Sequence, residues 1–363
     1  MLLKGKEPQA RLFSFIREEI MVSERFIPKG AVYFPSRAFN AYQTYRDFRP
    51  EEIRRDFGYA EQAGINAIRL FLSYEYWLAF PEQLWEKFDT LLELARQSKI
   101  RVMPILFENC GRPSCPENAQ NGHPLTAACM QSPGRVVTGD PALWEGPLSF
   151  VDAFMKRYAG DDRLLAIEVM NEPNENSSDL PFARRMTQRA FEQKKQIPLT
   201  IGCIHLYHNL YFAQWIDVYQ FHENFPGSVQ EMQAKLVQAA ELQRVTGKQV
   251  WLTEWQRVRT AGPGWDSPVI PQEDTVPELC SLADAVYGSG IGNFFWSLML
   301  KPAYLPAQRP NGTFNGLFHE DGKVYSLQDY RAVCRRQDAE PAGVLATRPA
   351  WFTALLEKSE KER

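Results

Sequence analysis

The stretch Leu164-Leu-Ala-Ile-Glu-Val-Met-Asn171-Glu172-Pro173 decides the fold expected for this chain. Most of it is a short apolar run, which is typical of a strand buried in a parallel sheet. A glutamate lies where the strand should end. The run Gln249-Val-Trp-Leu-Thr-Glu254-Trp255 shows the same pattern of a short apolar run that ends in a glutamate. Glu172 and Glu254 are far apart in the sequence. A barrel of parallel strands would bring them together, because its site is assembled at the carboxyl ends of several strands.

The same alternation extends along nearly the whole chain. Short β-rich runs are followed by longer amphipathic stretches, which is typical of βα units around a parallel sheet. Eight strands are predicted, at 30–34, 66–72, 100–107, 164–171, 197–203, 218–222, 249–254 and 292–297. Helices are predicted at 50–63, 81–98, 148–158, 180–195, 229–246, 276–289 and 327–336, with a vaguer one in 206–215. We therefore expect an α/β fold, a single (β/α)8 TIM barrel.

The boundaries of this barrel follow from the same pattern. We expect residues 1–29 to form a strap that closes the barrel bottom, residues 30–340 to form the barrel, and residues 341–363 to form a C-terminal tail. The longest predicted loops, 108–146 and 298–325, both follow strands. They should overhang the face at the carboxyl ends of the strands.

Composition narrows the classes of partner. With 41 basic and 44 acidic residues the net charge is −3, so we expect neither nucleic acid nor an anionic membrane as a partner. No apolar run approaches the roughly 18 residues of a membrane span. The N-terminus lacks the apolar core of a signal peptide, so the chain is either cytoplasmic or an exported protein whose signal has been removed. A neutral polymer or a small molecule is the expected ligand.

The six cysteines are too sparse for a disulfide scaffold, and scattered buried thiols are the simplest interpretation. Cys110, Cys115 and Cys129 share one predicted loop, so a local disulfide there stays open. His205 and His208 lie three positions apart but lack a convergent third ligand. We therefore expect no metal and no cofactor.

At Asn171-Glu172-Pro173 and Thr253-Glu254-Trp255 the chain resembles clan A glycoside hydrolases, and most closely family 5 and the cellulase-like proteins around it. The resemblance extends from about Gly30 to Cys334. Supporting pieces fall on the expected strands: Phe34-Pro-Ser-Arg-Ala-Phe-Asn40, Gly64-Ile-Asn-Ala-Ile-Arg69, His222 and Phe294-Phe-Trp296. The resemblance implies a retaining β-glycosidase that cleaves a β-linked oligo- or polysaccharide through a covalent glycosyl-enzyme. Its oligomeric state stays open, although a monomer is plausible.

By this resemblance Glu172 would be the general acid/base and Glu254 the nucleophile. A retaining enzyme needs their carboxyl groups about 5 Å apart. The negative charge of Glu254 should raise the pKa of Glu172 in the free enzyme. Asn171 has the groups to hold a sugar 2-hydroxyl, and Arg69 would approach the nucleophile and keep it ionised.

Five further residues are candidates for substrate contact. Trp296 would form the floor under the sugar, and His222 would hydrogen-bond the substrate or a neighbouring catalytic group. Glu108 could face the cleft or lie on the surface, and Trp255 could stack on the leaving group or pack between strand and helix. Asn40 belongs to the motif after the first strand.

Glu168 should point into the barrel by the two-residue period of a strand, and we expect it to pair with an interior arginine such as Arg101 or Arg69. One departure from the family is Asn224. Many family 5 members have a tyrosine at this position, two residues after the histidine of the sixth strand, and the hydrogen bond it gives the nucleophile must come from elsewhere or be absent.

The alternatives are a transglycosylase, which uses the same site with a sugar hydroxyl in place of water, and a sugar-binding barrel without catalysis. The endo or exo mode also stays open. If the two long loops block one end of the cleft, short oligosaccharides and exo action are favoured.

Overall fold

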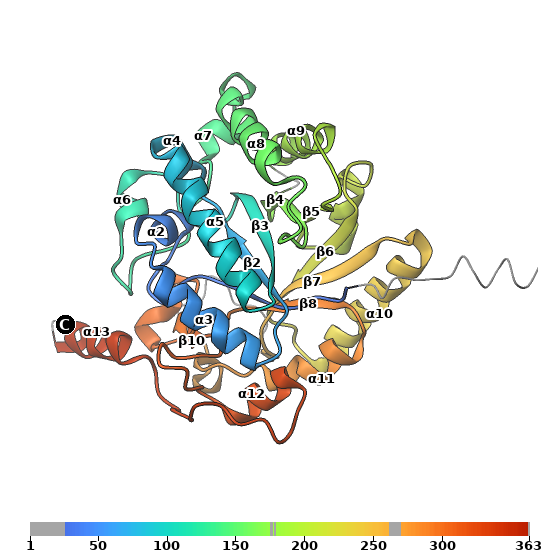
Figure 1. Cartoon of the computed structure of the whole chain (residues 1–363). Coiled ribbons are helices and arrows are strands. Elements are labelled where there is room, and N and C mark those ends of the chain that lie inside the picture. The colour runs from blue at the N-terminus through green and yellow to red at the C-terminus, as the bar shows by residue number, and fades with distance from the viewer. Residues whose placement is uncertain (1–25, 175–176, 178, 261–269, 362–363) are drawn as a thin grey trace, which may run out of the picture.

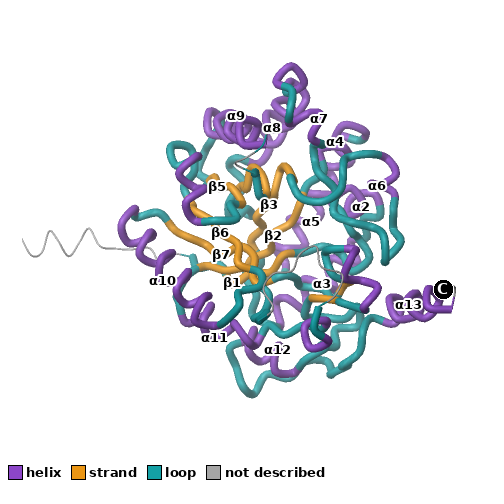
Figure 2. The backbone as a smooth tube through the Cα atoms, turned by 180° about the vertical axis from the view of Figure 1, so that it is seen from behind, coloured by secondary structure: helices purple, strands orange, loops and turns teal. Residues whose placement is uncertain are grey.

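The computed structural model describes residues 26–174, 177, 179–260 and 270–361. Eight parallel strands form one sheet in the order β5-β4-β3-β2-β1-β8-β7-β6, at the centre of Figures 1 and 2. Their bounds are β1 Lys29–Val32, β2 Ala67–Phe71, β3 Arg101–Glu108, β4 Ile167–Asn171, β5 Leu199–Gly202, β6 Val218–Glu223, β7 Gln249–Trp255 and β8 Gly292–Phe295. The predicted TIM barrel is confirmed.

The barrel closes between β5 and β6 through hydrogen bonds at the start of the two strands. The Asp217 amide donates to the Leu199 carbonyl at 2.8 Å. The Thr200 hydroxyl donates to the Val218 carbonyl at 2.9 Å. The two ends of the sheet are thereby joined, and all eight carboxyl ends meet on one face.

Helices surround the strands on the outside (Figure 2). Those that match the predicted ones are α3 Pro50–Gln62, α5 Pro81–Gln97, α8 Glu145–Tyr158, α9 Asp179–Glu192, α10 Val229–Thr246, α11 Cys280–Gly288 and α12 Leu327–Cys334. Proline begins both α3 and α5, where its missing N–H is harmless, and an acid follows each. None of the described helices is long and apolar enough to cross a membrane.

The predicted fifth helix is wrong in type and length. Between β5 and β6 the chain forms a short 3-10 helix, η2 Leu206–Tyr211. The Asn209 side chain fixes this short helix to the barrel, because it exchanges two hydrogen bonds with the backbone of Gln220 on β6 at 2.8 and 3.0 Å.

The two long connections on the carboxyl-end face contain their own short elements. After β3 these are α6 Pro116–Gln120, α7 Arg135–Thr138 and η1 Pro141–Leu143, and after β8 they are β9 Lys301–Pro302, η4 Pro306–Asn311 and β10 Phe314–Asn315. After β1 and β2 lie α2 Ala41–Arg46 and α4 Tyr74–Ala79, and η3 Gln272–Thr275 precedes α11.

The barrel interior is filled by large side chains that point inward from alternate strand positions, among them Val32, Met103, Trp251 and Phe294. Gly30 shows how tight this packing is. A Cβ atom there would lie 2.2 Å from the Phe294 ring, so only glycine lets that ring occupy the axis.

The expected strap at residues 1–29 lies mostly outside the described residues. The expected tail at residues 341–363 contains a helix, α13 Ala350–Lys361, at the edge of the molecule (Figure 1). Its Phe352 is fully buried against Leu300 and Phe314 of the loop after β8. The tail therefore packs on the barrel, and its helix was not predicted.

Candidate active site

A cavity of about 640 Å³ opens at the carboxyl ends of the strands. Its walls include one side chain from the end of each of several strands: Phe71, Glu108, Asn171, His222, Glu254 and, just after β8, Trp296. Glu172 also lines it, directly after β4. The fold has therefore assembled the predicted glutamates in one hollow, as a TIM barrel should.

The backbone of Glu172 turns its side chain into this cavity. Its φ is +46°, in the left-handed region that costs a residue with a side chain roughly 1–2 kcal/mol. Hydrogen bonds on both sides hold the turn: the Glu172 amide donates to the Gly202 carbonyl at 2.7 Å, and the Asn109 side chain donates to the Glu172 carbonyl at 2.8 Å. Strain of this kind concentrates at functional sites.

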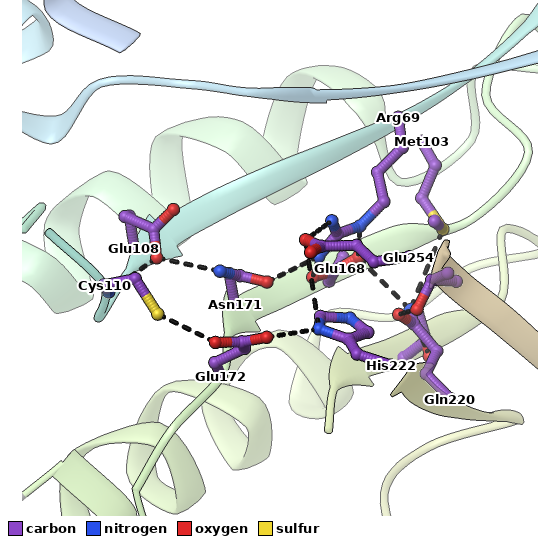
Figure 3. A network of polar contacts seen from close by, with 12 residues as sticks. Arg69, Met103, Glu108, Cys110, Glu168, Asn171, Glu172, Gln220, His222 and Glu254 are labelled. Carbon is purple, nitrogen blue, oxygen red and sulfur yellow. Dashed lines mark hydrogen bonds and ion pairs between the residues drawn. The ribbon is translucent and has the colours of Figure 1, made fainter. Parts of the chain in front are cut away.

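The two glutamates are neighbours in space. An oxygen of Glu172, an oxygen of Glu254 and a ring nitrogen of His222 all lie within 4.8 Å of one another. Figure 3 shows Glu172 between His222 and Cys110, with Glu254 beside the histidine ring. A spacing near 5 Å is that of carboxyl pairs that work from opposite sides of one glycosidic bond with retention.

Glu254 is held at both carboxyl oxygens. Arg69 on β2 donates to one at 2.7 Å, and Asn224 donates to the other at 3.0 Å. Arg69 is fully buried and is also paired with Glu168 at 2.7 and 2.5 Å, which confirms the expected interior partner. Gly202 on β5 leaves the space for this pair, because a Cβ there would lie 2.3 Å from the Glu168 carboxylate.

The surroundings of Glu172 overturn the expectation of a raised pKa. Burial raises the pKa of Glu172, but its contact with His222 at 2.5 Å and the thiol of Cys110 at 2.9 Å outweigh burial and lower it. Burial lowers the pKa of His222, but the charge of Glu254 and the Glu172 contact raise it. The two pKa shifts have opposite directions, and together they favour the proton on His222 over Glu172. Sequence patterns did not indicate Cys110, which is distant in sequence from Glu172.

No protein-family model matches the sequence, and no curated protein matches it. Solved structures do match. The endo-1,4-β-D-mannanase of Thermotoga petrophila RKU-1 aligns with 85% of this chain and 99% of its own, with a TM-score of 0.58 and 12% identity. A family 5 mannosidase from Rhizomucor miehei aligns over 93% and 95%, with a TM-score of 0.56 and 12% identity. The chain has the fold of family 5 glycoside hydrolases.

A third neighbour with this fold is a subfamily 18 member of family 5 from Streptomyces cattleya, solved with Manβ1-4GlcNAc. It aligns with 84% of this chain and 79% of its own, with a TM-score of 0.59 and 16% identity. At such low sequence identity these similarities establish only the fold of the present chain. Its chemistry depends on its own side chains.

Asn224 takes over the hydrogen bond that a tyrosine at this position gives the nucleophile in many family 5 members. Its Nδ2 supplies the hydrogen bond to Glu254, and Gln256 donates to its Oδ1 at 3.0 Å. The Glu254 carboxylate fixes the orientation of the Asn224 amide, because it can accept only from the Asn224 nitrogen and leaves the Asn224 oxygen to Gln256. Asn224 and Gln256 are both buried and both line the cavity.

We expect Asn224→Ala to lower kcat about 10- to 100-fold with little change in KM, since a hydrogen bond to a charged group contributes about 1.5–3 kcal/mol. Asn224→Asp should lose more, because a second carboxylate would then face Glu254. Steady-state kinetics on an aryl glycoside measures both. Gln256→Ala is the matched control and should fall between wild type and Asn224→Ala. Full activity in Asn224→Asp would contradict this role.

Glu108 lies at the cavity edge and is almost fully buried. Burial raises its pKa to about 8, although hydrogen bonds from the Asn171 side chain at 2.9 Å and the Cys110 amide at 2.7 Å oppose the shift. Glu108 therefore keeps its proton to a higher pH than an exposed glutamate does. It positions Asn171, whose oxygen in turn accepts from Arg69 at 2.6 Å.

This raised pKa predicts a pH-dependent stability. Between about pH 4.5 and pH 8 the folded state keeps the Glu108 proton and the unfolded chain releases it, so stability falls as pH rises through this window. Glu108→Gln removes that term. We expect its free energy of unfolding, relative to wild type, to rise by up to about 5 kcal/mol across the window, measured by urea denaturation. A constant difference would contradict the prediction.

The remaining predicted contacts divide into two groups. Trp296 lines the cavity with its ring nearly buried, as a floor would. Trp255 is fully buried, contacts the Tyr287 and Phe295 rings and donates to Asn293 at 3.1 Å, so it packs between strand and helix and does not reach a substrate.

Asn40 and Arg69 are also supporting residues and do not contact a substrate directly. Asn40 is fully buried, caps α2 by accepting from Gln43 at 3.0 Å, and donates to the Asn118 carbonyl at 3.2 Å. Arg69 is enclosed by Glu168, Glu254 and Asn171. The sequence placed both on the correct face but could not show that they lie behind its surface.

Within the described residues, Glu172, His222 and Glu254 form one group with the spacing of metal ligands. Both oxygens of Glu254 already accept hydrogen bonds, and Arg69 brings a positive charge against the same carboxylate. These contacts favour a carboxylate held for chemistry over a metal ligand. The expectation of no metal stays a prediction.

Proposed function

We propose that this protein is a retaining β-glycosidase in which Glu254 is the nucleophile and Glu172 the general acid/base. The observation that supports this most is the approach of the two carboxyl groups, with oxygens within 4.8 Å. Inverting enzymes separate their carboxyl groups by about 6.5–9.5 Å to admit a water molecule between carboxylate and sugar. The fixed orientation of Glu254 by Arg69 and Asn224 supports its role as nucleophile.

In the first step Glu254 attacks the anomeric carbon of a sugar that rests on Trp296. The bond from that carbon to the leaving oxygen breaks, and the oxygen takes a proton from Glu172. The proton reaches Glu172 from His222 through their 2.5 Å contact. Arg69 holds the Glu254 carboxylate in place through its 2.7 Å hydrogen bond until the bond forms.

In the second step Glu172 is a carboxylate and accepts a proton from a water molecule, which attacks the same carbon and releases Glu254. The sugar leaves with its original anomeric configuration, and the Glu172–His222 pair recovers its proton. A sugar hydroxyl in place of this water would make the protein a transglycosylase. That alternative differs in the acceptor and uses the same residues.

The substrate class is a β-linked glycan, and β-mannosides are the first candidates. Named neighbours of the same fold include mannanases and mannosidases, and one was solved with Manβ1-4GlcNAc. The neutral to weakly acidic net charge of this chain is compatible with an uncharged glycan.

The test is hydrolysis of 4-nitrophenyl β-mannoside, β-glucoside and β-galactoside, with the first-formed product anomer identified by proton NMR. We expect the β anomer first with at least one substrate. The α anomer first would overturn the retaining mechanism. A transglycosylase would show itself by longer glycoside products at high substrate concentration. Binding of these glycosides without any turnover would instead support the sugar-binding barrel.

A further inference from the structure

The cavity has an open side and a closed side. Beyond Glu172 and His222 it continues between the loops after β5, β6 and β7, where its walls include His205, Glu223, Glu231, Lys235 and Thr260. His205 and Glu231 are exposed, so among the described residues this side opens to solvent. In the opposite direction, past Trp296, the described lining ends at Tyr304 and Leu305 of the loop after β8.

Tyr304 forms the wall on the closed side. Its ring meets the Trp296 ring edge-on, with centroids 5.6 Å apart and an interplanar angle of 83°. A sugar lying on Trp296 would therefore abut Tyr304. A small pocket of about 20 Å³ lies behind this wall, lined by Phe34, Phe39 and Lys301 among others. That volume holds about one water molecule.

The wall is anchored from behind by a buried arginine. Arg309, only 2% exposed, donates to the Tyr304 carbonyl at 3.0 Å and to the Ala303 carbonyl at 2.6 Å. It also donates to the carbonyls of Pro124, at 3.0 Å, and Ala127 in the loop after β3. One guanidinium thereby ties the loop after β8 to the loop after β3, directly behind Tyr304.

Two further side chains fix the same region. Lys301 is buried and donates to the carbonyls of Ala38 at 2.5 Å and Pro35 at 3.3 Å, after β1. Gln43 on α2 donates to the carbonyls of Ala119 at 3.1 Å and Asn121 at 2.8 Å, in the loop after β3. The closed side is thus joined by buried hydrogen bonds among three loops, and such contacts are costly to break.

The direction of the substrate follows from the chemistry of the site. The anomeric carbon lies between Glu254 and Glu172, and the leaving group extends past the acid, toward the open side. The sugar ring extends the other way over Trp296, so its non-reducing end faces Tyr304.

We propose that the cavity accepts one sugar residue before the scissile bond, so that the protein removes single sugars from the non-reducing end of β-glycosides. The leaving group would lie among the polar and charged side chains of the open side, which suits a sugar or glycoconjugate. This inference rests on the proposed function. It refines that function from glycan cleavage in general to exo cleavage with a single-residue pocket.

The test compares 4-nitrophenyl β-mannoside with 4-nitrophenyl β-mannobioside, and the corresponding glucosides and galactosides. We expect direct release of nitrophenol from the monosaccharide substrate with kcat/KM at least about 100-fold higher than direct release from the disaccharide substrate, equivalent to about 2.7 kcal/mol. From a β-linked hexaose, single sugars should appear from the start. A hexaose whose non-reducing end is blocked by a 4-O-methyl group should resist cleavage.

Release of intact disaccharide at a comparable rate, or internal cleavage of the blocked hexaose, would overturn the single-residue pocket and leave the proposed glycosidase function standing. Absence of turnover on every substrate would overturn the glycosidase function and this inference together. Thus the two failures are distinguishable.

A pair of variants tests the wall itself. Tyr304→Ala should raise the disaccharide-to-monosaccharide ratio of kcat/KM at least about tenfold, because space for a second sugar opens beyond Trp296. Tyr304→Phe keeps the wall and should leave the ratio unchanged. Thermal unfolding of both variants checks that they fold. An unchanged ratio in a folded Tyr304→Ala protein would argue against Tyr304 as the barrier.

Discussion

Glu254→Ala is expected to lower kcat by about 10⁴-fold or more, equivalent to roughly 5 kcal/mol or more of lost transition-state stabilisation. The variant has no oxygen to form the covalent intermediate, so the two-step route is lost. The fold should survive, since Arg69 keeps its two hydrogen bonds to Glu168. Steady-state kinetics with the best aryl glycoside of the panel, together with thermal unfolding, measures both effects.

Chemical rescue distinguishes a lost nucleophile from a damaged site. Azide should enter the space left by Glu254 and restore part of the turnover, with the α-glycosyl azide as product. Glu241→Ala is the control, because this exposed carboxylate of α10 is not part of the cavity lining. We expect less than about a threefold change there. Glu254→Ala with more than about one per cent of wild-type activity would refute the assignment.

Glu172→Ala should have the second-largest effect, and its size should depend on the leaving group. General acid catalysis typically contributes about 10²–10⁴-fold. We expect a loss in that range for oligosaccharides, whose leaving oxygens need a proton. For a dinitrophenyl glycoside, which leaves without one, the first step should be nearly unaffected. The missing general base would then let the glycosyl-enzyme accumulate, visible as a burst of phenol and as a mass increase of one sugar.

Azide again provides a control, now with the β-glycosyl azide as product, because it replaces water in the second step. Cys110→Ala removes the other donor to Glu172 while leaving the carboxyl in place. It should lower activity less than tenfold. An equal loss for good and poor leaving groups in Glu172→Ala would mean that Glu172 is not the acid.

The neighbouring histidine explains why the charge state of Glu172 could not be predicted. The sequence shows two glutamates, and like charges raise each other's pKa. His222 is on a third strand, and its 2.5 Å contact with Glu172 depends on the positive φ of that residue and on the register of β4 and β6. The pKa shift of Glu172 is thus opposite to the expected one because of its distance to His222, and that distance cannot be read from the spacing of the two residues in the sequence.

The sequence likewise could not show which residues lie behind the site and support it without contacting a substrate. Arg69, Asn40 and Trp255 are candidates for substrate contact by sequence because they belong to motifs on or directly after the correct strands, with packing between strand and helix as the alternative for Trp255. Their side chains prove buried, with hydrogen bonds to other protein groups. Whether a residue at a strand end reaches the surface depends on which loops cover it, and those loops come from distant parts of the chain.

The sequence by itself determined the barrel, most of its helices and the placement of both glutamates after β4 and on β7, because these follow from local periodicity and from the common direction of parallel strands. Only the tertiary structure decided the direction of the Glu172 pKa shift, that Asn224 supplies the second bond to Glu254, and that Arg309 ties two loops together behind Tyr304. Each of these depends on contacts between residues far apart in sequence. Such contacts have energies of a few kcal/mol that depend on distance and burial, and neither the distance nor the burial can be read from the sequence.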